Sequence, residues 1–446
     1  MRRRRPAQSG FTLVELMVSL VAGLIIAMAV VGLAQQATKT FHEEVRAGSA
    51  EGQVRSAVER LRLDLVRAGY MSTGNIKLDP KIARRAGAAT GSRYLQLDNL
   101  SSIRLFQNGS FAATNADNLA TNNVLSPDTI WLTGNFTSTD EYEGVYLKTG
   151  GNCGGPRMLL GQTPPLIEND ATVYQLVKGG AVGVKRTFMP ADSHEFVARI
   201  TDRVGCFHYA PVCDAGLIAG QAFVDFKADS NGHAGVPSGA IDGRSCGVPD
   251  GNGSVERLFV APIQTVQWSI QRRPDPDLDP IAGLEPATHK FDLVRQFVDS
   301  NGTLVDRLLN ASDPEPERVA EWAVDLKFGF TVDQALSAAA VGTTGLILSF
   351  DPDSATNATW AGLVATQNIG DPGPQRIRAV RFRVAVRSPM ADRQADVTPD
   401  LVPGYAGTYR YRYCVDNVAI ASCTRFARVR TVMSEVSLRN QGRMYY

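Results

Sequence analysis

Hydrophobic residues dominate one stretch near the start of the chain, between Ser9 and Ala34. This stretch is apolar over about 24 residues, the length that a helix needs to cross a bilayer. Its only acidic residue is Glu15, and an ionisable group within a membrane span is costly enough to indicate a function. Four arginines at residues 2–5 precede the stretch, and flanking arginines stay on the cytoplasmic side. We therefore predict a membrane span over residues 11–34, with the rest of the chain outside the cytoplasm.

After residue 34 the pattern becomes that of an amphipathic helix. The recurring apolar residues are Phe41, Val45, Val54, Val58, Leu61 and Leu65. Arg60 and Asp64 stand four residues apart and are expected to pair on the polar side. Gly69 is expected to end the helix. The sequence thus predicts one helix from residue 12 to residue 68, about 85 Å long, whose second half, residues 35–70, packs on a globular head.

The remaining residues, 71–446, read mainly as β-strands separated by turn-rich stretches. Candidate strands are 94–97, 129–132, 172–177, 195–200, 258–260, 265–271, 321–330, 375–387, 409–415 and 425–438. A hairpin is predicted over 293–308, because Asn301-Gly302 supplies the positive φ angles of a type I′ turn. The turn-rich stretch 225–255 is predicted to be a surface insertion. The expected fold class is α+β, with a long N-terminal helix packed on a large β-rich head.

The composition narrows the functions open to this head. Its 46 basic and 45 acidic residues nearly balance, so the chain as a whole offers no electrostatic argument for binding nucleic acid. The sequence contains no nucleophile motif, no Walker loop and no H-E-x-x-H zinc motif. Asp275, Asp277 and Asp279 have the spacing that opens an EF-hand loop, but Pro280 stands where that loop needs glycine. We therefore expect no enzyme activity, no metal centre and no cofactor.

One basic stripe lies in the second half of the chain. The residues Arg376, Arg378, Arg381, Arg383 and Arg387 alternate with apolar residues. Such a stripe could bind DNA, but the favoured interpretation is a half-buried strand whose polar face is solvated. The alternation slips by one residue at 379–380, which predicts a β-bulge.

The six cysteines favour disulfides in a chain exported from the cytoplasm. They are Cys153, Cys206, Cys213, Cys246, Cys414 and Cys423. Fifteen pairings are possible, and the sequence alone does not choose among them. Closeness in the chain favours Cys206–Cys213 and Cys414–Cys423, which would leave Cys153–Cys246.

Three interpretations of the N-terminal stretch compete. A cleaved secretory signal does not fit, because the apolar run is too long, contains Glu15 and lacks a small-residue cleavage site. A plain membrane anchor explains the length but gives no reason for Glu15. The third is a prepilin leader, since Gly-Phe-Thr-Leu-Val-Glu at residues 10–15 resembles the type III signal of type IV pilins and pseudopilins.

That resemblance implies a maturation pathway. Residues 1–10 would be the leader peptide, removed by a prepilin peptidase between Gly10 and Phe11 on the cytoplasmic side of the membrane. The new amino group of Phe11 would then be methylated, and the apolar helix would be kept. In the family the glutamate helps to set subunit register, so the resemblance gives Glu15 a role in subunit assembly. A carboxylate beside the cationic amine of Phe11 also offsets the cost of burying either charge.

Later segments resemble the PilW-type minor pilins. They are residues 126–132, 318–333, 378–389 and 425–440, the last of which ends in Leu-Arg-Asn. This resemblance implies a structural subunit of a priming or tip complex that promotes pilus assembly. It would sit in the inner membrane with its head in the periplasm, and then in the extracellular pilus. Its partners would be other minor pilins, the major pilin and a large tip adhesin. The alternatives are a J-type pseudopilin of a type II secretion system, and a tip module that binds DNA or a surface.

Overall fold

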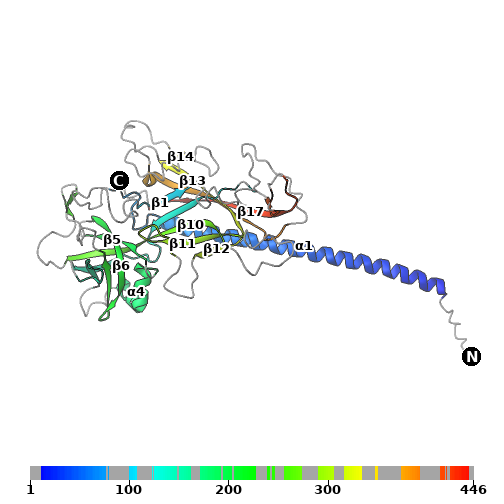
Figure 1. The fold of residues 1–446 in the computed structure, drawn as a ribbon, viewed down its shortest axis with the longest axis horizontal. Helices are drawn as coiled ribbons and strands as arrows, with labels where there is room; N and C mark the ends of the chain where they lie inside the picture. Colours follow the sequence, from blue (N-terminus) through cyan, green and yellow to red (C-terminus); the bar gives the residue numbers. More distant parts are fainter. Residues whose placement is uncertain are drawn as a thin grey trace, which may run out of the picture.

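A long helix enters a β-rich head in the computed structural model, and two large sheets make up much of that head (Figure 1). The structure describes residues 12–76, 79, 100–107, 123, 125–147, 150–161, 171–191, 194–202, 205–227, 239–241, 244–246, 256–273, 290–305, 316–333, 347–349, 373–391, 412–416, 418 and 422–440. The helix and the β-rich head confirm the expected α+β fold class. Gly10, Phe11, the candidate strand at 94–97 and most of the insertion at 225–255 lie outside the described residues.

Helix α1 spans Leu13–Arg67 without interruption. It ends where the sequence predicts, because Gly69 takes a φ of 75°, a conformation that favours glycine. The head does not cover the whole predicted amphipathic half, since Phe41 and Val45 are exposed. Burial begins at Ala50 and continues on one side of the helix through Val54, Ala57, Val58, Leu61 and Leu65. The head therefore holds only the last third of the helix.

The larger sheet contains ten antiparallel strands. In chain order they are β1 (Ile103–Phe106), β2 (Thr129–Gly134), β3 (Tyr142–Leu147), β4 (Arg157–Leu160), β5 (Phe196–Thr201), β6 (Phe207–Ile218), β7 (Gln221–Phe226), β10 (Glu256–Arg272), β11 (Phe291–Val298) and β12 (Glu317–Ala320). Strand β10 joins two halves of this sheet. Its residues 256–263 pair with β3 and β5, and its residues 264–272 pair with β2 and β11.

A second sheet has five strands in the order β14-β13-β15-β17-β16. Their bounds are β13 (Ala323–Asp333), β14 (Ile347–Ser349), β15 (Ile377–Arg387), β16 (Arg412–Cys414) and β17 (Phe426–Ser437). The short strands β8 (Gly239–Ile241) and β9 (Arg244–Cys246) pair with each other, and the single turn η5 (Pro374–Arg376) precedes β15. Helices α3 (Ala171–Lys178) and α4 (Gly180–Phe188) pack together, and α4 lies against β6.

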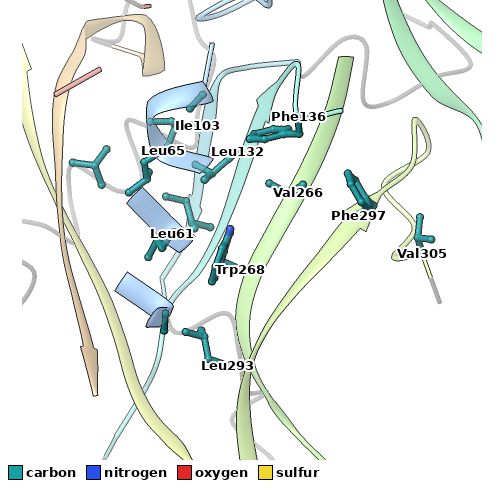
Figure 2. Packing of buried hydrophobic residues seen from close by; sticks show 14 of the residues in the cluster. Leu61, Leu65, Ile103, Leu132, Phe136, Val266, Trp268, Leu293, Phe297 and Val305 are labelled. Atoms are coloured by element: carbon teal, nitrogen blue, oxygen red, sulfur yellow. The ribbon is translucent and has the colours of Figure 1, made fainter. Parts of the chain in front are cut away.

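The embedded end of α1 lies between the two sheets (Figure 2). Leu61 and Leu65 of the helix pack with Leu132 of β2, Trp268 of β10 and Leu293 of β11. The same buried cluster continues into the second sheet through apolar residues of β13, β15 and β17. One hydrophobic core thus holds the helix against both sheets. Because this core requires apolar side chains on one side of the helix, the sequence shows the apolar stripe from Val54 to Leu65.

Most candidate strands that fall on described residues are strands in the structure, and one is not. Several strands had no candidate in the sequence, among them β1, β3, β4, β6 and β7. Residues 172–177 were expected to form a strand but belong to helix α3. This run is short, and periodicity alone does not distinguish a short apolar strand from a short helix. The candidates at 258–260 and 265–271 form a single strand, β10, which passes through Pro262.

The predicted type I′ turn is also wrong. Gly302 has a φ of 84°, but Asn301 does not take a positive φ. Instead Asp299 organises the turn, since its Oδ1 accepts hydrogen bonds from the N–H groups of Asn301 and Thr303. Beyond the turn Leu304 bridges back to Val298, and the Val305 N–H donates a hydrogen bond to the Phe297 carbonyl at 3.0 Å. The chain thus folds back on the end of β11 as the predicted hairpin requires, but through a different turn, and residues 306–308 of that hairpin lie outside the described residues. Residues 293–295 of β11 pair instead with β10 on one side and β12 on the other.

Two predicted disulfides are corrected by the structure. Cys213 pairs with Cys153, with their Cα atoms 6.5 Å apart, so neither Cys206–Cys213 nor Cys153–Cys246 forms. Cys206 precedes β6 and Cys213 lies inside it, and seven residues of extended strand separate Cα atoms by about 23 Å, beyond the reach of a disulfide. Cys206 is also disulfide-bonded, and the side chain of Cys246 lies outside the described residues. The predicted Cys414–Cys423 pair is confirmed.

Candidate functional site

Residues 13–34 of α1 form an apolar rod that no described part of the head covers. Its large hydrophobic side chains are exposed from Leu13 to Leu33. This helix is long and apolar enough to cross a membrane. A hydrophobic surface of this size is stable only in lipid or against other proteins. The rod is therefore the candidate site for membrane insertion and for contact with other subunits.

Glu15 lies in the first turn of the rod and closes a capping box with Thr12. The Glu15 carboxylate accepts hydrogen bonds from the backbone N–H and the hydroxyl of Thr12, both at 3.2 Å. In return the Thr12 hydroxyl accepts a hydrogen bond from the N–H of Glu15 at 3.3 Å. Threonine followed three residues later by glutamate is the sequence signature of this cap. This cap is a second role of Glu15, which the charge of its side chain alone does not predict.

A buried ion pair fixes the other end of α1 to the head. Asp64 Oδ2 accepts hydrogen bonds from Arg295 Nε on β11 at 2.6 Å and from Trp268 Nε1 on β10 at 3.0 Å. Asp64 and Arg295 are both buried. The predicted pair of Arg60 with Asp64 is wrong, because Arg60 instead lies 3.3 Å from Glu317 of β12. Asp64 therefore bonds to residues that are 204 and 231 positions away in the chain, and not to Arg60, which stands four positions before it.

Strand β17 runs lengthwise along the embedded part of α1. Near one end of the strand, Asn440 Nδ2 donates a hydrogen bond to the carbonyl oxygen of Val66 at 2.7 Å. Near the other end, Arg46 Nη1 lies 3.1 Å from the sulfur of Met390, which follows β15. These contacts lie about 30 Å apart along the helix axis. The second sheet is thus aligned with the helix along much of β17.

A second buried charge cluster stands beside the first. Lys290 Nζ lies 3.3 Å from Glu321 and 3.8 Å from Asp292, and both Lys290 and Asp292 are buried. Asp292 Oδ1 accepts a hydrogen bond from the N–H of Trp322, whereas its Oδ2 has no hydrogen-bond partner among the described residues. Burial raises the pKa of the Asp292 carboxyl, against the opposing effects of Lys290 and the Trp322 N–H. The ionised form of Asp292 therefore destabilises the folded head.

We expect Asp292→Asn to stabilise the protein at neutral pH. The folded-state pKa lies above the unfolded value of about 4, so the charge lowers stability as pH rises through the interval between the two pKa values. Urea unfolding should show a higher midpoint for Asp292→Asn at pH 7 and no gain near pH 3. Glu59→Gln, a matched change at an exposed helix position, should alter neither midpoint. A lower midpoint for Asp292→Asn at pH 7 would contradict the assigned cause.

The basic stripe is not a free surface along its described length. Arg383 is buried and donates from Nε to Asp325 Oδ2 at 2.7 Å. Arg387 is buried between the rings of Trp322 and Tyr413, and Arg381 pairs with Glu435. The predicted β-bulge is present, because Thr331 faces Ala379 while Val332 faces Ile377, so Arg378 is the extra residue. The stripe is thus a strand held by ion pairs and aromatic rings, with a more buried polar face than expected.

One group of possible metal ligands occurs among the described residues. It comprises Cys414, Asp416 and Cys423. The two cysteines are joined in a disulfide, so neither offers a thiolate. Burial works against ionisation of Asp416, but hydrogen bonds from Arg425 and Thr424 outweigh it and lower the pKa to about 2. The group therefore closes a loop next to β17 and gives no metal site.

The comparisons with known proteins bear on the N-terminus alone. Residues 5–31 match the model of the family described as prokaryotic N-terminal methylation motif. No curated protein and no solved structure matches the chain. The matched residues include the Gly10–Phe11 junction, Glu15 and much of the exposed apolar rod. Together with the rod and the head that follows it, this motif supports a type IV pilin-like protein, anchored in a membrane by its N-terminal helix and carrying a soluble β-rich head.

Proposed function

We propose that this protein is a minor pilin of the PilW type, a structural subunit of a priming or tip complex that promotes type IV pilus assembly. The observation that carries the proposal is the methylation motif at the start of a helix whose apolar part stands clear of the head. Such a helix can pass from the membrane into a bundle of similar helices without unfolding the head. The proposal includes no enzyme activity and no cofactor.

In this proposal each part of the N-terminus has its own task. A prepilin peptidase cuts between Gly10 and Phe11, and the Phe11 amine is methylated. The inner membrane then holds the rod until assembly, when other minor pilins and the major pilin replace lipid around it. Glu15 caps the rod and supplies the carboxylate that pairs with a Phe11 amine of the same or a neighbouring subunit. A large tip adhesin is a further expected partner.

Mass spectrometry of the mature protein tests the first step. We expect the protein from assembled filaments to begin at a methylated Phe11. Gly10→Ala should reduce processing only partly, because alanine is still small, whereas a bulky residue at position 10 should block it. Recovery of intact Met1 from assembled filaments would overturn the prepilin assignment.

Fractionation tests the choice between pilus and secretion system. We expect the processed subunit in pili sheared from cells, together with other minor pilins. A J-type pseudopilin would instead stay with the envelope and co-purify with components of a type II secretion system. A cluster of minor-pilin genes beside a tip-adhesin gene would support the pilus in the same way. A tip module that binds DNA has less support, because the described arginines of the stripe are engaged within the head.

A further inference from the structure

Arg104 lies on β1, on the face of the larger sheet that points away from the core. Successive side chains of a strand point to opposite faces, and Ile103 and Leu105, on either side of Arg104, are buried in the core around α1. Arg104 and Phe106 therefore share the opposite face. Trp131 stands directly across from Arg104 in the register of β1 and β2, so its side chain lies on this face too.

Two aromatic rings hold the guanidinium group of Arg104. Its Cζ lies 5.2 Å from the centroid of the Phe106 ring and 5.2 Å from that of the Trp131 ring. The Trp131 ring is fixed in turn, because its Nε1 donates a hydrogen bond to Gln267 Oε1 on β10 at 2.7 Å. A cation–π contact uses the charge of a guanidinium but none of its hydrogen-bond donors. The N–H groups of Arg104 are therefore not engaged by the two rings.

Arg104 has no carboxylate partner in the head. Buried arginines of this protein pair with acids elsewhere, as Arg383 does with Asp325 at 2.7 Å. Burial lowers the pKa of the Arg104 guanidinium, and no carboxylate opposes that effect. None of its nitrogens is sealed from solvent without a bond, in contrast to Nε of Arg60. Arg104 is thus a partly buried cation whose donors still reach the surface.

The chemistry of this cluster fits a single carboxylate. An anion beside a partly buried cation favours its charged form and offsets part of the cost of burial. The planar guanidinium also matches a carboxylate through two parallel N–H···O bonds. One positive charge neutralises one carboxylate, whereas a polyanion such as DNA is bound by several cations together.

We propose that Arg104, Phe106 and Trp131 form a docking point for a neighbouring pilin-like subunit, which places an acidic side chain against Arg104 and an apolar side chain against the rings. Arginine and aromatic residues are enriched at the centres of protein interfaces, which favours a protein as the partner. Because this face of the sheet points away from α1, the partner contacts the side of the head and not the helix. The identity of the neighbour as a pilin-like subunit rests on the proposed function.

Site-specific photocrosslinking in whole cells tests this docking point. The photoreactive amino acid benzoylphenylalanine is placed at Gln107, which follows β1, and in a matched chain at Val182, an exposed residue of α4. We expect the probe at Gln107 to yield an adduct with a second protein that carries a prepilin leader, mapped to a segment that contains an acidic residue. The probe at Val182 should yield no such adduct.

Variants of Arg104 separate an ion pair from simple proximity. With the probe at Gln107, Arg104→Gln should lower the adduct about tenfold, the effect of losing a charge-assisted hydrogen bond. Arg104→Lys keeps the charge but not the two parallel donors, and should lower the adduct about threefold. Arg186→Gln, a matched change at an exposed arginine of α4, should leave it unchanged. Resistance of the head to protease checks folding, and Arg104→Lys carries the test if Arg104→Gln does not fold.

An exchange of charges identifies the partner carboxylate. Arg104→Glu should abolish the adduct, and so should a change of the mapped acidic residue of the partner to arginine. The two changes together should restore the adduct to within about twofold, because the pair is formed again with its charges exchanged. If the double variant stays as low as either single variant, the proposed ion pair is wrong.

The remaining outcomes distinguish this inference from the proposed function. Equal adducts at Gln107 and Val182 would overturn it, as would an adduct with a second copy of this chain alone. If the subunit is present in sheared pili but Gln107 gives no adduct, the minor-pilin function stands and the docking point fails. An adduct with pseudopilins of a secretion system would support the docking point and overturn the pilus assignment.

Discussion

Arg295→Met is expected to lower the free energy of unfolding by about 3–5 kcal/mol, because it leaves the Asp64 carboxylate buried without its counter-charge. A domain is typically stable by about 5–15 kcal/mol, so this single change would remove a large share of the total. Trp268 Nε1 would remain as the neutral hydrogen-bond donor to Asp64. Urea unfolding of the full-length protein in detergent, followed by tryptophan fluorescence, measures the effect.

A matched substitution on the same helix controls for the loss of an arginine. Arg55 forms an ion pair with Glu51, but 72% of its side chain is exposed, and such pairs contribute less than about 1 kcal/mol. Arg55→Met should therefore leave the unfolding midpoint nearly unchanged. The double variant Asp64→Leu/Arg295→Met removes both buried charges and should recover much of the loss. Equal midpoints for Arg295→Met and Arg55→Met would show that the buried pair does not hold the helix.

Glu15→Val is expected to block assembly while leaving membrane insertion intact. The change removes the only charge within the span, so insertion should be unchanged or improved. Processing should also survive, since Gly10 and Phe11 are untouched. The Phe11 amine would lose its partner, and an unpaired charge in an apolar environment costs several kcal/mol, enough to shift an association equilibrium by orders of magnitude. The measurement is the amount of the variant in sheared pili relative to membranes.

The capping box adds a control that separates two roles of Glu15. Glu15→Gln keeps an oxygen that can accept the Thr12 hydrogen bonds but carries no charge. If charge pairing drives assembly, Glu15→Gln should fail as Glu15→Val does. If Glu15→Gln assembles normally and Glu15→Val does not, the cap is the essential contribution. Wild-type incorporation of Glu15→Val would refute an assembly role for this residue.

The helix could be predicted from the sequence because its signals are local. The apolar run, the stripe from Val54 to Leu65 and the stop at Gly69 each depend on residues within a few turns of one another. The leader motif is likewise one short continuous segment. The strands β13, β15 and β17 could also be predicted from the sequence, because their apolar residues alternate with polar ones over many positions.

The joint between helix and head was not predictable in the same way. Asp64 has a suitable partner four residues earlier in the chain, yet it is buried against Arg295 and Trp268, which the fold brings from far away. Cys213 likewise bonds to Cys153, 60 residues away, because the extended strand β6 carries it away from Cys206. In both cases closeness in sequence favoured a pair that the tertiary structure prevents.

Strand β10 gives the head a continuous path for mechanical load. A pull on α1 reaches β10 directly, because Trp268 bonds to Asp64 of the helix. The same strand then continues without a linker into residues 256–263, which pair with β3 and β5. Tension applied to the helix is therefore shared between both halves of the larger sheet through one covalent backbone. If the helix is drawn out of a membrane during the proposed assembly, the pull therefore reaches residues 256–263 of β10, and with them β3 and β5, along the same strand.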